Sequence, residues 1–132
     1  MESEWAHVKR IENFINFQAR ERNIPLDKLD SIPVSLLVFD LHWFTVKGAL
    51  DFVSDINATI KSSTKRLIES AEEVKLITGR GTHSSDQMPA IKQTLLEEYQ
   101  GRIRVDSTNN GALFLRFEKK LTYADYIKTV FL

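Results

Sequence analysis

The chain has 132 residues, which fits one domain with short extensions, and 42% of them are hydrophobic, enough for a packed core. Its 18 basic and 18 acidic side chains cancel, so nucleic-acid binding would need a local basic patch. The lack of cysteine excludes disulfides, thiolate metal sites and a cysteine nucleophile. Because the acidic start lacks a signal-peptide core and no apolar run could cross a membrane, we expect a cytoplasmic protein without a membrane partner.

Residues 1–32 form the predicted N-terminal helical extension, and Pro25 ends its helix. The apolar positions at helical spacing are Trp5, Val8, Ile11, Phe14 and Ile15. Because large apolar and aromatic side chains are usually buried, we expect this helix to pack on the rest of the domain.

Residues 33–118 form the predicted α/β domain, in which short apolar strands alternate with amphipathic helices. The predicted strands cover residues 34–41, 74–78, 103–106 and 112–117, and the predicted helices run from the N-cap Thr45 to about residue 71 and from about residue 88 to Gly101. A turn is predicted at residues 109–111, Asn-Asn-Gly, so that the last two strands are antiparallel.

Residues 119–132 form the predicted C-terminal extension, with a short helix over residues 122–132. Together these elements predict a two-layer α/β sandwich with a four-stranded mixed sheet, a βαβαββ core, flanked by an N-terminal and a short C-terminal helix. The two β-α-β crossovers are expected to be right-handed.

Polar side chains follow the first two predicted strands. Asp40 and His42 are two residues apart at the end of the first strand, so both project to the same face. An aspartate beside a histidine can orient the ring for acid–base chemistry, although it can also serve simply as a cap or turn residue before the next helix. Because sites in open α/β sheets lie beyond the carboxyl ends of parallel strands, we expect this pair to meet the loop after the second strand.

That loop begins Gly79-Arg80-Gly81 and precedes a helix. Flanking glycines let the backbone approach a ligand closely, and an arginine provides a fork suited to phosphate oxygens. His83 lies in the same loop, and two histidines on either side of a phosphodiester can divide the roles of acid and base. The alternative is an ordinary turn with a solvated arginine.

Aromatic and basic side chains near these tips are candidate contacts for a substrate. Trp43 can stack on an unpaired base or lie in the core. The side chains that could extend a basic rim are Lys92, Arg102 and Arg104. A metal site built from Asp40, His42 and His83 ranks lower, because the set contains a single carboxylate and its spacing matches no familiar site, so no metal and no cofactor is expected.

Two motifs together resemble the Smr (small MutS-related) domain family, over about residues 34–117. The family's Leu-Asp-Leu-His-Gly motif corresponds here to residues 39–43, Phe-Asp-Leu-His-Trp, and its Gly-Lys/Arg-Gly loop to residues 78–84, Thr-Gly-Arg-Gly-Thr-His-Ser. Residues 89–92, Pro-Ala-Ile-Lys, and 111–113, Gly-Ala-Leu, also fit the family pattern. The chain departs from that pattern at Trp43, where the family has glycine, and at residues 85–87, which lack further glycines.

The resemblance implies nuclease activity, in particular that of eukaryotic relatives that cut messenger RNA on stalled or collided ribosomes. It implies catalytic roles for Asp40, His42, Arg80 and His83. The substrate-binding set is Trp43, Gly79, Gly81, Thr82, Ser84, Lys92, Arg102 and Arg104.

Our leading hypothesis is therefore a metal-independent endoribonuclease for single-stranded RNA, with RNA and the ribosome as partners, acting as a monomer or as a domain of a larger protein. The alternatives are a non-catalytic nucleic-acid- or ribosome-binding module and a metal-dependent DNA nicking endonuclease.

Overall fold

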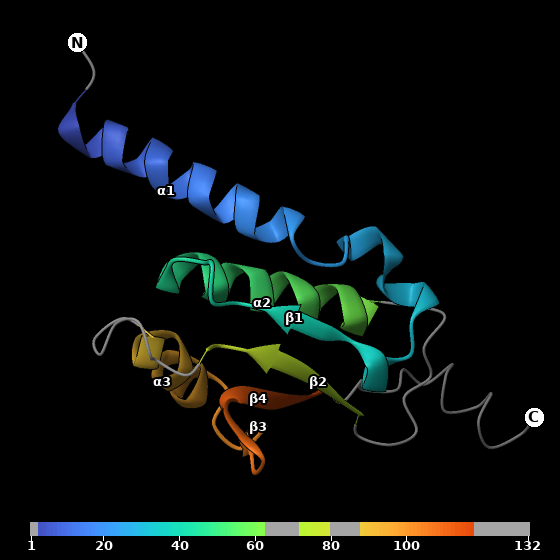
Figure 1. Cartoon of the computed structure of the whole chain (residues 1–132). Helices are drawn as coiled ribbons and strands as arrows, with labels where there is room; N and C mark the ends of the chain where they lie inside the picture. The colour runs from blue at the N-terminus through green and yellow to red at the C-terminus, as the bar shows by residue number, and fades with distance from the viewer. Residues whose placement is uncertain (1–2, 63–71, 80–87, 118–132) are drawn as a thin grey trace, which may run out of the picture.

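The computed structural model describes residues 3–62, 72–79 and 88–117 of the chain (Figure 1). Its elements in chain order are the helix α1 (Glu4–Glu21), the 3₁₀ helices η1 (Leu26–Ser31) and η2 (Val34–Leu36), β1 (Val38–Asp40), α2 (Val46–Ser62), β2 (Glu72–Ile77), α3 (Met88–Glu98), β3 (Ile103–Asp106) and β4 (Asn109–Phe117). The predicted α/β class is confirmed, and the predicted C-terminal helix lies outside the described residues. Within the described residues, no helix has the length and apolar character needed to cross a membrane.

The four strands form one mixed sheet in the order β1-β2-β4-β3. β1 runs parallel to β2, with Asp40 opposite Ile77, while β4 is antiparallel to both of its neighbours, β2 and β3. The carboxyl ends of β1 and β2 therefore lie side by side at one end of the sheet. This is the arrangement that the sequence predicts for the two polar motifs.

The hydrophobic core lies between one face of the sheet and the helices α2 and α3. Phe39, Leu76 and Leu113 come from three neighbouring strands and are fully buried, together with Ile56 of α2 and Leu95 of α3. Because side chains alternate along a strand, the residues between these buried ones project to the other face of the sheet, where Val38 is exposed and Lys75 and Phe114 are half-buried. Asp40 and His42 belong to this second set, since Leu41 between them is buried.

The first strand is shorter than the sequence predicts. Pro33 begins the 3₁₀ helix η2, in which Leu36 N–H donates to the Pro33 carbonyl at 2.9 Å, so that pairing with β2 begins only near Leu37. Leu36 is 67% exposed, whereas Val34 is buried. The apolar spacing predicts a strand over residues 34–41, but the first half of this run is a helical turn with one buried side.

The turn between β3 and β4 also differs from the prediction. It lies at Ser107 and Thr108, and the Asn-Asn-Gly segment of residues 109–111 is already part of β4. The Asp106 carboxylate accepts hydrogen bonds from Thr108 N (2.9 Å) and Thr108 Oγ1 (2.8 Å). Aspartate commonly stabilises a turn in this way, by binding the backbone two residues further on.

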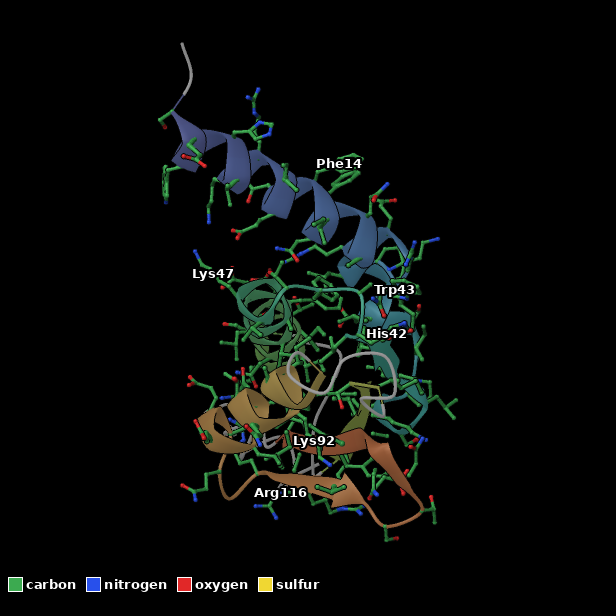
Figure 2. The ribbon with its side chains drawn as sticks, turned by 60° about the vertical axis from the view of Figure 1, so that its left-hand side comes forward. Phe14, His42, Trp43, Lys47, Lys92 and Arg116 are labelled. Carbon is green, nitrogen blue, oxygen red and sulfur yellow. The ribbon has the colours of Figure 1, made fainter. Side chains whose placement is uncertain are left out.

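The expectation that the apolar face of the N-terminal helix packs on the domain is wrong for most of α1. Trp5 is 74% and Phe14 is 61% exposed, whereas Ala19 near the end of the helix is buried. Figures 1 and 2 both show the first half of α1 extending beyond the remaining elements. Helical periodicity predicted the helix itself, but it does not specify which part of the helix finds a partner.

The second half of α1 is joined to the start of α2 through Asn16. Asn16 Oδ1 accepts from Thr45 N and Asn16 Nδ2 donates to Thr45 Oγ1, both at 3.0 Å, while Thr45 Oγ1 accepts from Gly48 N as the predicted N-cap. A Cβ atom on Gly48 would lie only 2.2 Å from Asn16 Oδ1. Glycine at this position therefore allows the Asn16 side chain to approach the N-terminus of α2.

We predict that Gly48→Ala destabilises the fold by about 1–3 kcal/mol, because the new methyl group displaces Asn16 from its hydrogen bonds with Thr45. In an Asn16→Ala background the same change becomes neutral or stabilising, since alanine favours a helix over glycine by about 1 kcal/mol. Urea denaturation of the wild type, both single variants and the double variant measures this coupling. An equal cost of Gly48→Ala in both backgrounds would contradict it.

We predict that Asp106 makes the stability of the hairpin sensitive to acid. The hydrogen bonds from Thr108 hold the pKa of Asp106 below its ordinary value, and Lys75 Nζ at 3.6 Å lowers it further. A carboxylate with a depressed pKa stabilises the fold above its unfolded pKa of about 3.9, and this contribution is lost as the pH falls through the folded pKa. Asp106→Asn should therefore lose less stability than the wild type between pH 6 and pH 3 in urea denaturation, and an identical loss would contradict the prediction.

Candidate active site

The centre of the candidate site is the Asp40–His42 pair at the carboxyl end of β1. Asp40 Oδ1 accepts a hydrogen bond from the backbone N of His42 at 3.1 Å. It also forms a close hydrogen bond with Nδ1 of the His42 ring. The side chains of Asp40 and His42 are 33% and 32% exposed, so the pair is held by the fold and remains open to solvent. Because the carboxylate occupies Nδ1, the nitrogen left to exchange a proton with a substrate is Nε2.

Asn23, just after α1, fixes the backbone of this strand end. Its Nδ2 donates to the Asp40 carbonyl at 3.0 Å and its Oδ1 accepts from Asp40 N at 2.7 Å, so that the amide pairs with both outward-facing backbone groups of the residue. Nδ2 also donates to the Ala19 carbonyl at the end of α1, at 3.0 Å. Asn23 is not found from the sequence: its position directly after a helix and before Ile24-Pro25 indicates a helix end, but not the strand that it binds.

Trp43 adds an aromatic surface beside the pair. Its ring centroid lies 4.2 Å from that of His42, and Figure 2 shows the two side chains next to each other. Trp43 is 49% exposed, whereas Phe44 is buried and stacks on Phe52 with the ring centroids 5.0 Å apart. The guanidinium carbon of Arg22 lies 4.0 Å above the Trp43 ring centroid, at cation–π distance.

The end of β2 is tied to β4 by its backbone. Thr78 N and Gly79 N both donate to the Gly111 carbonyl, at 2.8 and 3.1 Å. Gly79 has a φ of 87°, a conformation that favours glycine. Since the Gly79 N–H is already engaged, this residue shapes the start of the loop and does not offer a free donor to an anion. Lys92 Nζ donates to the Asn110 carbonyl at 3.0 Å, which brings its charge to the same end of the sheet.

Two of the predicted rim residues lie elsewhere. Arg104, on the edge strand farthest from β1, binds Glu73 through Nε (2.9 Å) and Nη2 (3.0 Å), and this hydrogen bonding raises the pKa of Arg104. Arg102 precedes β3 and donates to Asn57 of α2 at 3.1 Å and to the Arg116 carbonyl at 3.2 Å. Arg116 lies far from His42 in Figure 2, so Arg102 belongs to the opposite end of the sheet.

The remaining predicted residues fall outside the described part of the chain, and their roles stay predictions. They are Arg80, Gly81, Thr82, His83 and Ser84. Within residues 3–62, 72–79 and 88–117, no group of three or more histidine, aspartate or glutamate side chains is arranged to hold a metal ion. From the predicted set, the structure brings Asp40, His42 and Trp43 into contact, places Gly79 at the end of the neighbouring strand, and shows Lys92 bound to Asn110 without a contact to the pair among the described residues. It adds Arg22 and Asn23.

Comparison of the chain with models of protein families, with curated proteins and with solved structures gives no match. A function for the protein is therefore inferred from the residues of the site and their geometry.

We predict that Asn23→Ala destabilises the protein by about 1–3 kcal/mol, because it leaves the outward backbone groups of Asp40 without their partner. Hydrogen exchange should show faster exchange of the Asp40 amide, while urea denaturation measures the stability. Asn13→Ala, on the exposed face of α1, is the matched control and should change neither quantity. Equal behaviour of the two variants would show that the Asn23 amide does not hold β1.

Proposed function

We propose that the protein is an endoribonuclease that cleaves single-stranded RNA without a metal ion. The observation that carries the proposal is the hydrogen-bonded Asp40–His42 pair, which is partly open to solvent at the carboxyl end of a parallel strand. A carboxylate that holds Nδ1 fixes the orientation of the imidazole and leaves Nε2 free to act as a general base towards a substrate.

In the proposed reaction, His42 Nε2 takes the proton of a ribose 2′-hydroxyl, and the 2′-oxygen attacks the adjacent phosphorus. The bond from phosphorus to the 5′-oxygen breaks, and that oxygen receives a proton. The products are a 2′,3′-cyclic phosphate and a 5′-hydroxyl. Acid–base assistance of this kind contributes about 10²–10⁴-fold to a rate.

Two residues of the loop after β2 complete the proposal. Arg80 would stabilise the negative charge that develops on the phosphoryl oxygens, and His83 would protonate the leaving oxygen. The roles of the two histidines can be exchanged, since an imidazole can either take or give a proton. Lys92, which the Asn110 carbonyl binds at the same end of the sheet, supplies a further positive charge for the RNA backbone.

The resemblance of the two motifs to the Smr family supports the same activity, and we extend the proposal to messenger RNA on stalled or collided ribosomes in the cytoplasm. The formal net charge of the chain is zero, so long-range attraction to RNA is weak. Because the chain itself attracts RNA only weakly, we propose that the ribosome or another domain delivers the substrate.

We predict that His42→Ala lowers the cleavage rate of a labelled single-stranded RNA by about 10²–10⁴-fold in the presence of a chelator, because it removes the proposed base. Asp40→Asn should also lower the rate, since an amide cannot stabilise the protonated imidazole. His7→Ala is the control, because His7 is an exposed histidine on α1, outside the site, and its loss should leave the rate unchanged.

A substrate with a single 2′-deoxy nucleotide at the cleavage position tests the chemistry directly. We expect this substrate to bind and to remain intact, because it lacks the attacking hydroxyl. If the 2′-deoxy substrate is cleaved fully, and only when magnesium or manganese is present, the protein would instead be a metal-dependent DNA nicking enzyme. Binding without cleavage of any RNA would leave a nucleic-acid-binding module.

A further inference from the structure

We propose that Arg22 and Trp43 form a stacking subsite for an unpaired nucleobase beside the Asp40–His42 pair. This inference rests on the proposed function and names the part of the substrate that the site would grip. The observation behind it is that Trp43 contacts two neighbours. The Arg22 guanidinium carbon lies 4.0 Å from the Trp43 ring centroid, and the Trp43 and His42 ring centroids lie 4.2 Å apart with their planes tilted by 42°.

The exposure of Trp43 distinguishes it from the core aromatics around it. Phe44, the next residue, is buried against Phe52, so the local fold has an apolar core into which Trp43 does not turn. About half of the indole surface remains in solvent at 49% exposure, immediately beside the imidazole. A half-exposed tryptophan next to an acid–base pair offers a flat apolar surface that a base can cover.

Arg22 gives this surface a positive charge. Arg20, two residues earlier, pairs with Asp55 at 2.6 Å, and Arg104 pairs with Glu73. Arg22, in contrast, has the Trp43 ring as its partner and no ion pair within the described part of the chain. A guanidinium plane stacks on bases as an aromatic ring does, and its charge attracts the phosphates on either side.

The position of Arg22 relative to His42 is fixed by its neighbour. Asn23 holds both backbone groups of Asp40, so the end of α1 and the end of β1 are joined one residue away from the stack. A base that stacks on the Arg22 plane, or that replaces Arg22 on the indole, would place the adjoining ribose and phosphate towards the imidazole. Such a subsite selects single strands, because a paired base has no free face to offer.

Fluorescence of Trp43 provides a direct test. The chain has two tryptophans, and Trp5 is largely exposed on α1, so Trp5→Phe leaves Trp43 as the sole tryptophan, whose emission is excited selectively at wavelengths that tyrosine does not absorb. The probes are a single-stranded oligodeoxynucleotide, which lacks the attacking hydroxyl, and an abasic strand of equal length with the same phosphates. We expect the first to quench Trp43 emission and to bind about tenfold to a hundredfold more tightly than the second.

Variants assign the effect to the stack. Trp43→Ala should lower the affinity for the base-containing strand about tenfold to a hundredfold in fluorescence anisotropy, and Trp43→Phe should retain most of it. Arg22→Gln should weaken binding of the base-containing strand and reduce its preference over the abasic strand. The control Lys28→Gln removes an exposed charge from η1 and should leave that preference unchanged. Circular dichroism confirms that the variants are folded.

Equal binding of the two strands with unchanged Trp43 emission would overturn the subsite, and so would the absence of any oligonucleotide binding. These outcomes are separate from the fate of the nuclease proposal. Base-dependent binding without cleavage of RNA would support the subsite and reject the nuclease proposal. Cleavage of RNA together with equal binding of the base-containing and abasic strands would support the nuclease proposal and reject the subsite.

Discussion

The pairing of the Asn23 amide with the backbone of Asp40 is the interaction on which the candidate site depends. β1 is an edge strand, and edge strands present N–H and C=O groups without a neighbouring strand. The amide of Asn23 has one donor and one acceptor side, so it satisfies both groups of Asp40 as a strand residue would. The same contact holds the end of α1 beside the acid–base pair, where Arg22 lies over the Trp43 ring.

Asp40 therefore has two separate functions in the structure. Its backbone is held by Asn23 on the outer side of the strand, and its carboxylate is left to hold both the backbone N–H and the Nδ1 of His42. Thr45, and not Asp40, caps α2. The bond from His42 N gives the Asp40 carboxylate the same turn role that Asp106 has with Thr108, and the same carboxylate also holds the His42 ring.

The order of strands and helices could be predicted from the sequence, because long-range burial leaves a local pattern of apolar spacing. The errors arise where a local contact competes with that pattern. Pro33 turns the start of the first predicted strand into a 3₁₀ helix, and Asp106 captures Thr108, so that the turn forms before the Asn-Asn-Gly segment. Periodicity describes which faces are apolar, but these contacts decide where an element begins.

Only part of the candidate site could be predicted from the sequence. Asp40 and His42 could be found from the sequence because they are neighbours at a predicted strand end, and Gly79 because it follows the next strand. Asn23 lies 17 residues before the residue that it holds. No spacing rule links a helix end to the tip of a strand across two 3₁₀ helices, so this contribution required the structure.

The frame of the site is built from hydrogen bonds to the backbone, those of Asp40 with the Asn23 side chain and of Gly79 with Gly111. The side chains of His42, Trp43 and Arg22 take no part in those bonds, so chemistry and stacking can change by substitution while the frame is kept.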